Sequence, residues 1–263
     1  MKQTAILVFA MVGILFATQT MSAQPDLARE QRMAEQIVDA IFDGEPFELE
    51  AQGNAFLAIH TETDADTPKG NVLILHGRGF HPDWATVVQP LRVGLVGHGW
   101  NTLSIQMPVL DKAAKYFDYV DIFDDAGPRI EAALAYLREN NDGPIVIVAH
   151  SCGSHMAQHW IHQGGEDALS KFDAYVGIGM GATDYRQPMV EPFALEKMKM
   201  PVLDVYGEED YPAVLRMARE RSDMIWRGAN PKSRQEMVPG AGHYFEEMGE
   251  ELTDVIAQWL DTL

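Results

Sequence analysis

The sequence predicts an α/β fold built on a doubly wound, mostly parallel sheet. The first observation is that short, continuous apolar runs recur along the chain, a pattern typical of strands covered on both faces. The second is that helical segments with an apolar stripe separate these runs, and such alternation implies right-handed crossovers. The third is size and composition, because 263 residues that are 46% hydrophobic and 22% charged suffice for one large domain.

The first 23 residues are expected to be a secretory signal peptide. Lys2 provides a positive start, and Ala5–Ala17 is an uncharged apolar run, shorter than the roughly 20 residues that span a bilayer. A polar stretch then ends at Ala23, after which we expect cleavage. An uncleaved membrane anchor is the alternative. The sequence therefore predicts an exported protein, periplasmic or secreted, with no stable membrane anchor.

The domain is expected to fill residues 24–263 and to begin with a helix and a hairpin over residues 24–62. Pro25–Asp43 has apolar residues at helical spacing, and Pro46–Ala51 and Phe56–Thr61 flank a turn with glycine and asparagine. Five apolar runs follow as candidate strands of the main sheet: Val72–Leu75, Thr102–Met107, Ile145–Ala149, Tyr175–Gly179 and Val202–Tyr206.

Three apolar stripes between and after these runs predict the helices that cover the sheet. The first stripe begins at Trp84 and ends at Leu95, the second runs from Ile130 to Leu137, and the third runs from Leu252 to Leu260. The sequence shows no internal repeat, no low-complexity tract and no linker, so a single domain is expected.

Composition excludes several classes of function. The chain has 20 Lys and Arg against 39 Asp and Glu, a net charge of −19, which argues against binding to nucleic acid or an anionic membrane. Cys152 is the only cysteine, so neither an internal disulfide nor a thiolate zinc site can form. No glycine-rich nucleotide motif follows the first strand, and we expect no cofactor.

Ser151 is the candidate nucleophile. The apolar strand Ile145–Ala149 leads through a sharp turn into a helix expected over Cys152–Gln163. In such a turn the residues two before and two after the serine must be small, because the backbones of strand and helix nearly touch. Here they are Ala149 and Gly153, one methyl group away from the full G-x-S-x-G pattern. Alternatively, Ser151 only caps the helix.

A serine hydroxyl needs a base, and the base needs a carboxylate that holds its tautomer. His243 lies in a glycine-rich turn before the last helix, and Asp210 lies after the fifth strand. The chain order serine, acid, histidine is the one found when this site is built on an α/β sheet. Asp184, after the fourth strand, is the alternative acid, whereas Asp204 lies inside a strand.

Backbone amides are expected to hold the oxyanion that forms when a carbonyl is attacked. One amide should come from Cys152, directly after the nucleophile, and the other from Arg78 in the loop after the first strand. Cys152 could instead be the nucleophile, although its side chain should point away from the site. No metal is expected, because His155, His159 and His162 share a helix face without the glutamate of H-E-x-x-H.

These motifs resemble the α/β-hydrolase superfamily from about Asn71 to the C-terminus. The resemblance rests on His76–Gly79, Ala149–Gly153, Gly207–Asp210 and Gly242-His243. It implies the α/β-hydrolase fold, and only about twenty residues lie where lids are often inserted in that superfamily, so no large lid domain is expected.

A narrower resemblance covers nearly the whole mature chain. It rests on the three segments Ala28–Arg32, Leu75–Trp84 and Gln106–Leu110. They look like a family of exported proteobacterial proteins that is hydrolase-like and of unassigned function. This resemblance implies a periplasmic location and does not indicate a substrate.

The function expected from these residues is that of an exported serine hydrolase. It would cleave a carboxylic ester or thioester, a small-molecule acyl substrate, through an acyl-enzyme on Ser151. The alternative is a catalytically inactive, hydrolase-like binding or assembly factor of the periplasm.

Overall fold

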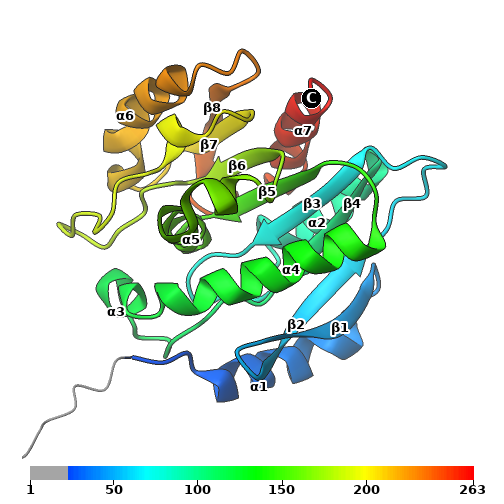
Figure 1. The fold of residues 1–263 in the computed structure, drawn as a ribbon. Helices are drawn as coiled ribbons and strands as arrows, with labels where there is room; N and C mark the ends of the chain where they lie inside the picture. Colours follow the sequence, from blue (N-terminus) through cyan, green and yellow to red (C-terminus); the bar gives the residue numbers. More distant parts are fainter. Residues whose placement is uncertain (1–22) are drawn as a thin grey trace, which may run out of the picture.

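The computed structural model describes residues 23–263, and the expected signal peptide lies almost entirely outside them. Eight strands form one sheet (Figure 1). The strands are β1 (Glu45–Ala51), β2 (Asn54–Thr61), β3 (Gly70–Leu75), β4 (Trp100–Ile105), β5 (Ile145–His150), β6 (Ala174–Ile178), β7 (Val202–Glu209) and β8 (Arg234–Gly242). Their order across the sheet is β1-β2-β4-β3-β5-β6-β7-β8.

The sheet is mostly parallel. β1 pairs antiparallel with β2, and β2 pairs antiparallel with β4, whereas every other neighbouring pair is parallel. All residues of β3, β4, β5 and β6 are buried, which explains why these strands read as unbroken apolar runs. The five strands expected for the main sheet and the preceding hairpin are confirmed, with ends that differ from the expected ones by at most three residues.

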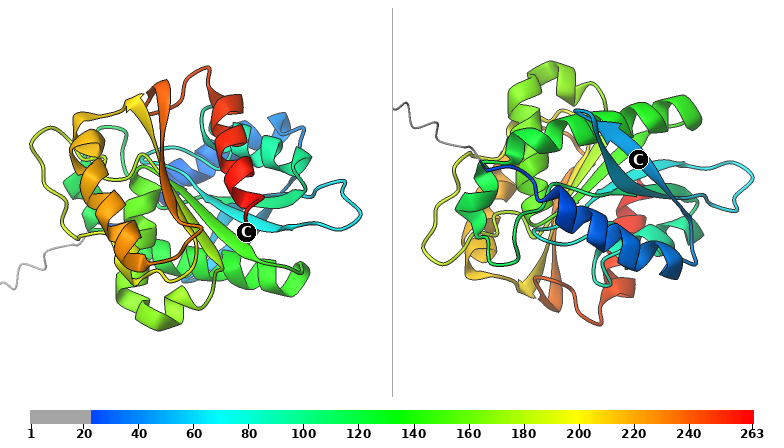
Figure 2. Two further views of the ribbon diagram at one scale, coloured as in Figure 1. Left: turned by 90° about the horizontal axis from the view of Figure 1, so that it is seen from above. Right: turned by 90° about the horizontal axis from the view of Figure 1, so that it is seen from below.

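Helices cover both faces of the sheet (Figures 1 and 2). The helices are α1 (Leu27–Ile37), α2 (Val88–Gly97), α3 (Tyr116–Val120), α4 (Ala126–Asn140), α5 (Cys152–Leu169), α6 (Pro212–Gly228) and α7 (Gly249–Leu260). Apolar side chains of α2 and α7 form one core with one face of the sheet, while those of α4 and α5 form a second core with the other. α1 lies beside the β1–β2 hairpin.

Two expected helices are shorter in the structure. The apolar stripe from Trp84 to Leu95 begins before its helix, because α2 starts only at Val88 and Val87 has a positive φ of 58°. The N-terminal helix was expected to reach Asp43 but ends at Ile37, followed by a 3₁₀ turn over Val38–Ala40.

The sequence analysis missed β8. We expected Pro239–Gly242 to form a turn, but it is the end of this strand, which lies at the edge of the sheet. Proline and glycine are tolerated there because an edge strand uses only one side of its backbone for pairing. The residue types of Pro239–Gly242 therefore did not indicate a strand.

The connections place the candidate site at one edge of the sheet. The carboxyl ends of the parallel strands meet there, as they do in doubly wound sheets with a ligand site. Between β6 and β7 the chain forms a loop with only the 3₁₀ turn Leu195–Lys197, so no large lid domain is inserted. Within residues 23–263, no helix combines the length and apolar character needed to cross a bilayer.

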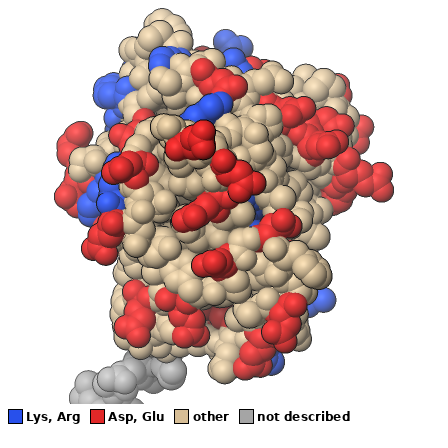
Figure 3. All heavy atoms as spheres, turned by 90° about the vertical axis from the view of Figure 1, so that its right-hand side faces the viewer, with Lys and Arg blue, Asp and Glu red and all other residues tan. Residues whose placement is uncertain are grey.

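Acidic side chains are spread over the face that looks away from this edge (Figure 3). Few basic side chains lie among them, in keeping with the net charge of −19. The acidic side chains of this face are therefore solvated.

Candidate active site

Ser151 occupies a strained turn between β5 and α5. Its φ of 52° and ψ of −121° lie outside the regions that a side chain ordinarily allows. The backbone N–H of Ser151 donates to the Ile178 carbonyl at 2.9 Å, and that of Ser154 donates to the Ser151 carbonyl at 3.0 Å. These bonds stabilise the turn and hold the Ser151 side chain at the carboxyl edge of the sheet.

Glycines allow other backbone segments to approach this turn. A Cβ on Gly153 would lie 2.5 Å from the His76 carbonyl oxygen and 2.7 Å from that of Leu75, so helix and strand touch there. A Cβ on Gly77 would lie 3.3 Å from Cβ of Ser151. Ala149 is fully buried and its methyl group belongs to the core, which explains why alanine suffices two residues before the serine.

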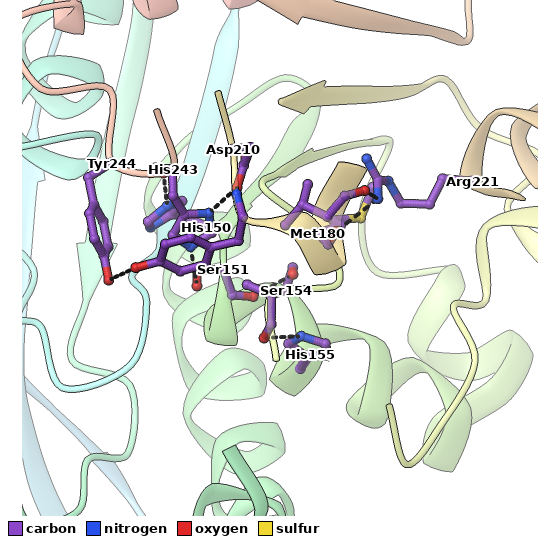
Figure 4. Close-up of polar contacts among 12 residues, drawn as sticks. His150, Ser151, Ser154, His155, Met180, Asp210, Arg221, His243 and Tyr244 are labelled. Carbon is purple, nitrogen blue, oxygen red and sulfur yellow. Dashed lines mark hydrogen bonds and ion pairs between the residues drawn. The ribbon is translucent and has the colours of Figure 1, made fainter. Parts of the chain in front are cut away.

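Ser151, His243 and Asp210 form one hydrogen-bonded chain (Figure 4). Ser151 Oγ lies 2.8 Å from His243 Nε2, and His243 Nδ1 lies 2.6 Å from Asp210 Oδ1. A carboxylate only accepts hydrogen bonds, so Nδ1 carries the proton and Nε2 is free to accept from the hydroxyl. This is the tautomer that a general base for Ser151 requires.

Buried groups hold this chain in place. The Asp210 carboxylate has no exposed surface, and its Oδ1 also accepts the backbone N–H of Tyr211 at 2.6 Å. The Tyr211 ring stacks on the His243 imidazole with centroids 4.2 Å apart. Gly179 has a positive φ of 59°, and a Cβ there would lie 2.8 Å from His243 Cε1. The imidazole is therefore fixed by a carboxylate, an aromatic face and a glycine.

His150 and His76 support the site, although the sequence analysis gave them no role. His150 Nε2 donates to the His243 carbonyl at 3.0 Å, and burial, helped by the nearby His243, lowers the pKa of His150 to about 3. His76 Nδ1 donates to the Gly77 carbonyl and its Nε2 accepts the Met107 N–H, both within 2.9 Å. Burial likewise lowers the pKa of His76 to about 3. In the sequence, the feature that points to this role is that His76 and His150 each follow directly after a predicted strand.

The two amides expected to hold an oxyanion lie beside the serine. Arg78 and Cys152 both line the same cavity as Ser151. Among residues 23–263, no carbonyl or side chain accepts a hydrogen bond from either backbone N–H. The Cys152 thiol is buried in the core, which raises its pKa to about 12, so it is a poor nucleophile.

Asp184, the alternative acid, pairs with Arg78 instead of His243. Its Oδ2 accepts from Arg78 at 2.8 Å and from the Tyr116 N–H at 2.6 Å. Burial acts against ionisation of Asp184, but these two donors hold the pKa of its carboxyl below the usual range. Asp204 pairs with Arg221 inside the core, at 2.7 Å. Of these three carboxylates, only that of Asp210 contacts the His243 imidazole.

Arg221 joins three elements behind the site (Figure 4). It is fully buried, and besides Asp204 of β7 it bonds the carbonyl of Met180, after β6, and that of Val214 in the first turn of α6. The segments on both sides of Asp210 are thereby fastened together, which keeps the carboxylate at a fixed position.

Helix α1 braces the loop that carries Arg78. The Arg29 guanidinium donates to the Gly79 carbonyl at 3.0 Å and to the Leu110 carbonyl. The neighbouring Glu30 is buried, accepts the Val109 N–H at 3.0 Å and pairs with Arg129 at 2.8 Å. The N-terminal helix thus connects the loop after β3 with the loop after β4.

The three histidines on α5 contact the loop between β6 and β7 and the 3₁₀ turn before α4. His155 and His162 lie within hydrogen-bond distance of the carbonyls of Ala182 and Pro192, and His159 lies between Asp124 and Glu191. In the described part of the chain, no group of three or more potential ligands could hold a metal ion. The helix face therefore anchors the β6–β7 connection.

A cavity of about 380 Å³ opens at Ser151. Its walls come from the loop after β3, the β6–β7 connection, the start of α6 and the loop after β8. Its polar and aromatic lining includes Arg78, Phe80, Tyr116, Ser151, Cys152, Thr183, Asp184, Tyr185, Arg186, Tyr211, Arg216 and Tyr244. The size suits a small organic molecule.

Known structures share this architecture. An α/β serine hydrolase homologue from Coxiella burnetii is 17% identical with a TM-score of 0.61, and the match covers 83% of this chain and 98% of that one. An α/β serine hydrolase without lid from Xanthomonas campestris is 11% identical with a TM-score of 0.61, over 84% and 95%. An esterase from Pyrococcus furiosus is 16% identical with a TM-score of 0.62, over 86% and 95%.

The comparisons of the sequence with known families and curated proteins assign no activity. Residues 12–117 match the model of a family described as "Protein of unknown function (DUF3530)". A search of curated proteins finds no matching relative. The family match spans α1, the loop after β3 and the loop after β4, which are the segments of the narrower sequence resemblance. From the strand order, the site at the carboxyl edge and the structural relatives, the chain has the α/β-hydrolase fold, without a large lid domain.

Proposed function

We propose that this protein is a serine hydrolase that cleaves a carboxylic ester or thioester. Ser151 Oγ attacks the acyl carbon while His243 Nε2 takes the hydroxyl proton. The carbonyl oxygen becomes negative and accepts hydrogen bonds from the N–H groups of Arg78 and Cys152. His243 then gives the proton to the leaving group, and an acyl-enzyme remains on Ser151.

Water completes the cycle by the same route. His243 takes a proton from a water molecule, the hydroxide oxygen bonds to the acyl carbon, and the bond to Ser151 Oγ breaks. The proton returns to Ser151 and the carboxylic acid leaves. Asp210 stays ionised throughout, orients His243 and stabilises the imidazolium that forms in both halves.

One observation carries this proposal: the continuous hydrogen-bonded chain from Ser151 to Asp210. Its two distances, 2.8 and 2.6 Å, suit proton transfer, and it is built on a strained turn that opens into a cavity. A binding factor without turnover would not need a buried carboxylate aligned behind the imidazole. The geometry therefore favours catalysis over the non-catalytic alternative.

Export remains part of the proposal. It rests on the apolar run Ala5–Ala17 and the polar stretch to Ala23, which lie outside the described residues except for Ala23. Fractionation of cells that produce the full chain should place a protein shortened by 23 residues outside the cytoplasm. A full-length protein retained in the cytoplasm would contradict it.

The hydrolase proposal is tested with nitrophenyl esters and thioesters of increasing acyl length. The mature protein should hydrolyse some of them, and Ser151→Ala should lose at least about 10³-fold in kcat. Ser170→Ala, at the exposed C-terminal end of the same helix, is the matched control and should keep full activity. Equal activity in Ser151→Ala and the native protein would contradict the proposal.

A further inference from the structure

The cavity has a charge opposite to that of the protein. The chain as a whole carries −19, yet the charged residues that line the cavity are three arginines and one aspartate. Arg78 and Asp184 balance each other in an ion pair at 2.8 Å. Arg186 and Arg216 remain, and neither guanidinium makes a hydrogen bond or an ion pair with any residue between 23 and 263. Two positive charges are thus left for a ligand.

The start of α6 adds to this positive field. Arg216 lies four residues after Pro212 and three after Ala213, so its side chain lies next to both on the helix surface, and all three residues line the cavity. No side chain caps this end of the seventeen-residue helix. Free N–H groups and the helix dipole favour an anion at such an end.

Arg186 lines the same cavity from the β6–β7 connection. It lies in the β6–β7 connection with a positive φ of 61°, and its guanidinium lies 4.8 Å from the centroid of the exposed Tyr185 ring. The histidine face of α5 anchors this connection through His155 and His159. Arg186 is therefore held by a fastened loop, and stacking on Tyr185 leaves its N–H groups available.

We propose that the cavity selects esters or thioesters that carry a carboxylate on the end remote from the scissile bond. Arg186 and Arg216 would bind this carboxylate while Ser151 attacks the ester carbonyl. The inference rests on the proposed hydrolase function. A single charge-assisted hydrogen bond to the carboxylate is worth about tenfold in kcat/KM or more.

The test compares charged and neutral substrates of the same shape. One pair is the mono-nitrophenyl ester of glutaric acid and its methyl-capped counterpart, with the charge on the acyl side. The other pair is the butyrate ester of a carboxyphenol and that of its methyl-capped phenol, with the charge on the leaving group. The native protein should prefer the anionic member of at least one pair by tenfold or more in kcat/KM.

Arginine variants show whether the preference comes from this subsite. Arg186→Gln combined with Arg216→Gln should reduce the ratio of anionic to neutral kcat/KM to near one. Arg32→Gln combined with Arg219→Gln removes the same charge from exposed positions outside the cavity and should keep the ratio. Equal rates within both pairs, or a preference that survives in the first double variant, would overturn the proposal.

A binding measurement separates this inference from the hydrolase proposal. If the native protein cleaves neither these pairs nor any nitrophenyl ester or thioester of the acyl series, the hydrolase proposal fails, and calorimetric titration with monomethyl glutarate still tests the anion subsite. The native protein should bind it, and the Arg186→Gln, Arg216→Gln variant should bind at least about tenfold more weakly. Absence of binding, or equal binding by both proteins, would overturn the subsite.

Discussion

At the scale of single residues, the site depends on contacts that tolerate no added atom. Ser151 keeps a positive φ because Gly153 lets the start of α5 lie directly against the end of β3. The hydrogen bond from Ser151 N–H to the Ile178 carbonyl then fixes the turn. Backbone packing therefore sets the position of the Ser151 hydroxyl, independently of its hydrogen bond to His243.

Gly153→Ala tests this packing. The new methyl group would overlap the backbone of His76 and Leu75, so we expect a loss of about 1–3 kcal/mol in the free energy of unfolding and a lower kcat. Gly97→Ala is the control, because nothing lies within 4 Å of a Cβ there. Urea denaturation measures both variants. Equal stability of Gly153→Ala and the native protein would show that the backbones do not touch.

Asp210→Asn tests the tautomer argument. An amide can donate to Nδ1, which would place the imidazole proton on Nε2 and remove the acceptor for Ser151. We expect kcat to fall by about 10⁴-fold with the fold intact. Asp184→Asn changes only the contacts with Arg78 and the Tyr116 N–H, away from the imidazole, and should cost far less. If the Asp184 variant suffered the larger loss, the acid would have been assigned to the wrong residue.

Sequence reasoning reached the three residues that form the hydrogen-bonded chain but not those that position them. Ser151 and Asp210 follow from their places after strands, and His243 follows from chain order and from the glycine-rich turn before the last helix. The sequence favoured Asp210 and left Asp184 as the alternative, because both follow a strand. In the structure Asp210 contacts His243, whereas Asp184 contacts Arg78 and Tyr116. The stacking of Tyr211 on His243 has no signature in the sequence.

At the scale of elements, α1 is the part whose role is least evident from its sequence. It buries mainly Glu30, so it contributes little apolar surface to the core. Instead Arg29 holds the carbonyls of Gly79 and Leu110, in the loops after β3 and β4. The helix therefore acts as a brace for the loop that presents the Arg78 amide.

Arg29→Met tests the brace. Without the guanidinium, the loop around Gly79 loses its anchor and the Arg78 amide shifts, so we expect kcat to fall by about 10- to 100-fold with KM nearly unchanged. Arg32→Met, on the exposed side of the same helix, should behave as the native protein. If the Arg29 variant had changed stability but native kcat, α1 would stabilise the fold without positioning the Arg78 amide.

The elements that sequence analysis placed well were those with a buried apolar repeat. β3 and β5 are buried on both faces and read as strands, whereas β8 contains Pro239, Gly240 and Gly242 and does not. Its pairing with β7 comes from tertiary contacts, including a close approach of Gly207 to Ala241. Local propensity could not indicate this strand.

At the scale of the whole molecule, several histidines are buried in the neutral form. Burial lowers the pKa of His155 to about 4, below its ordinary 6.5, as it does for His76 and His150. In the unfolded chain these groups take up protons near pH 6.5, so the unfolded state binds more protons. Their contribution to stability is present above pH 6.5 and is lost as the pH falls toward 4.

His155→Phe measures one such contribution. The ring packs against Tyr116, Phe123 and Phe193, so phenylalanine fits this setting. Between pH 5 and 6, the native free energy of unfolding should fall with acid more steeply than that of the variant, by about 1 kcal/mol per pH unit. His155→Gln should show the same change in slope. Parallel slopes in urea denaturation would mean that His155 stays accessible to protons.

The central claim is that His243 activates Ser151 for attack on an acyl group. Intact and tandem mass spectrometry of the mature protein after reaction with a fluorophosphonate measure this most directly. We expect one adduct per chain, on Ser151, formed far more slowly in His243→Ala and absent in Ser151→Ala. An unmodified native protein, or an adduct on another residue that survives in Ser151→Ala, would contradict it.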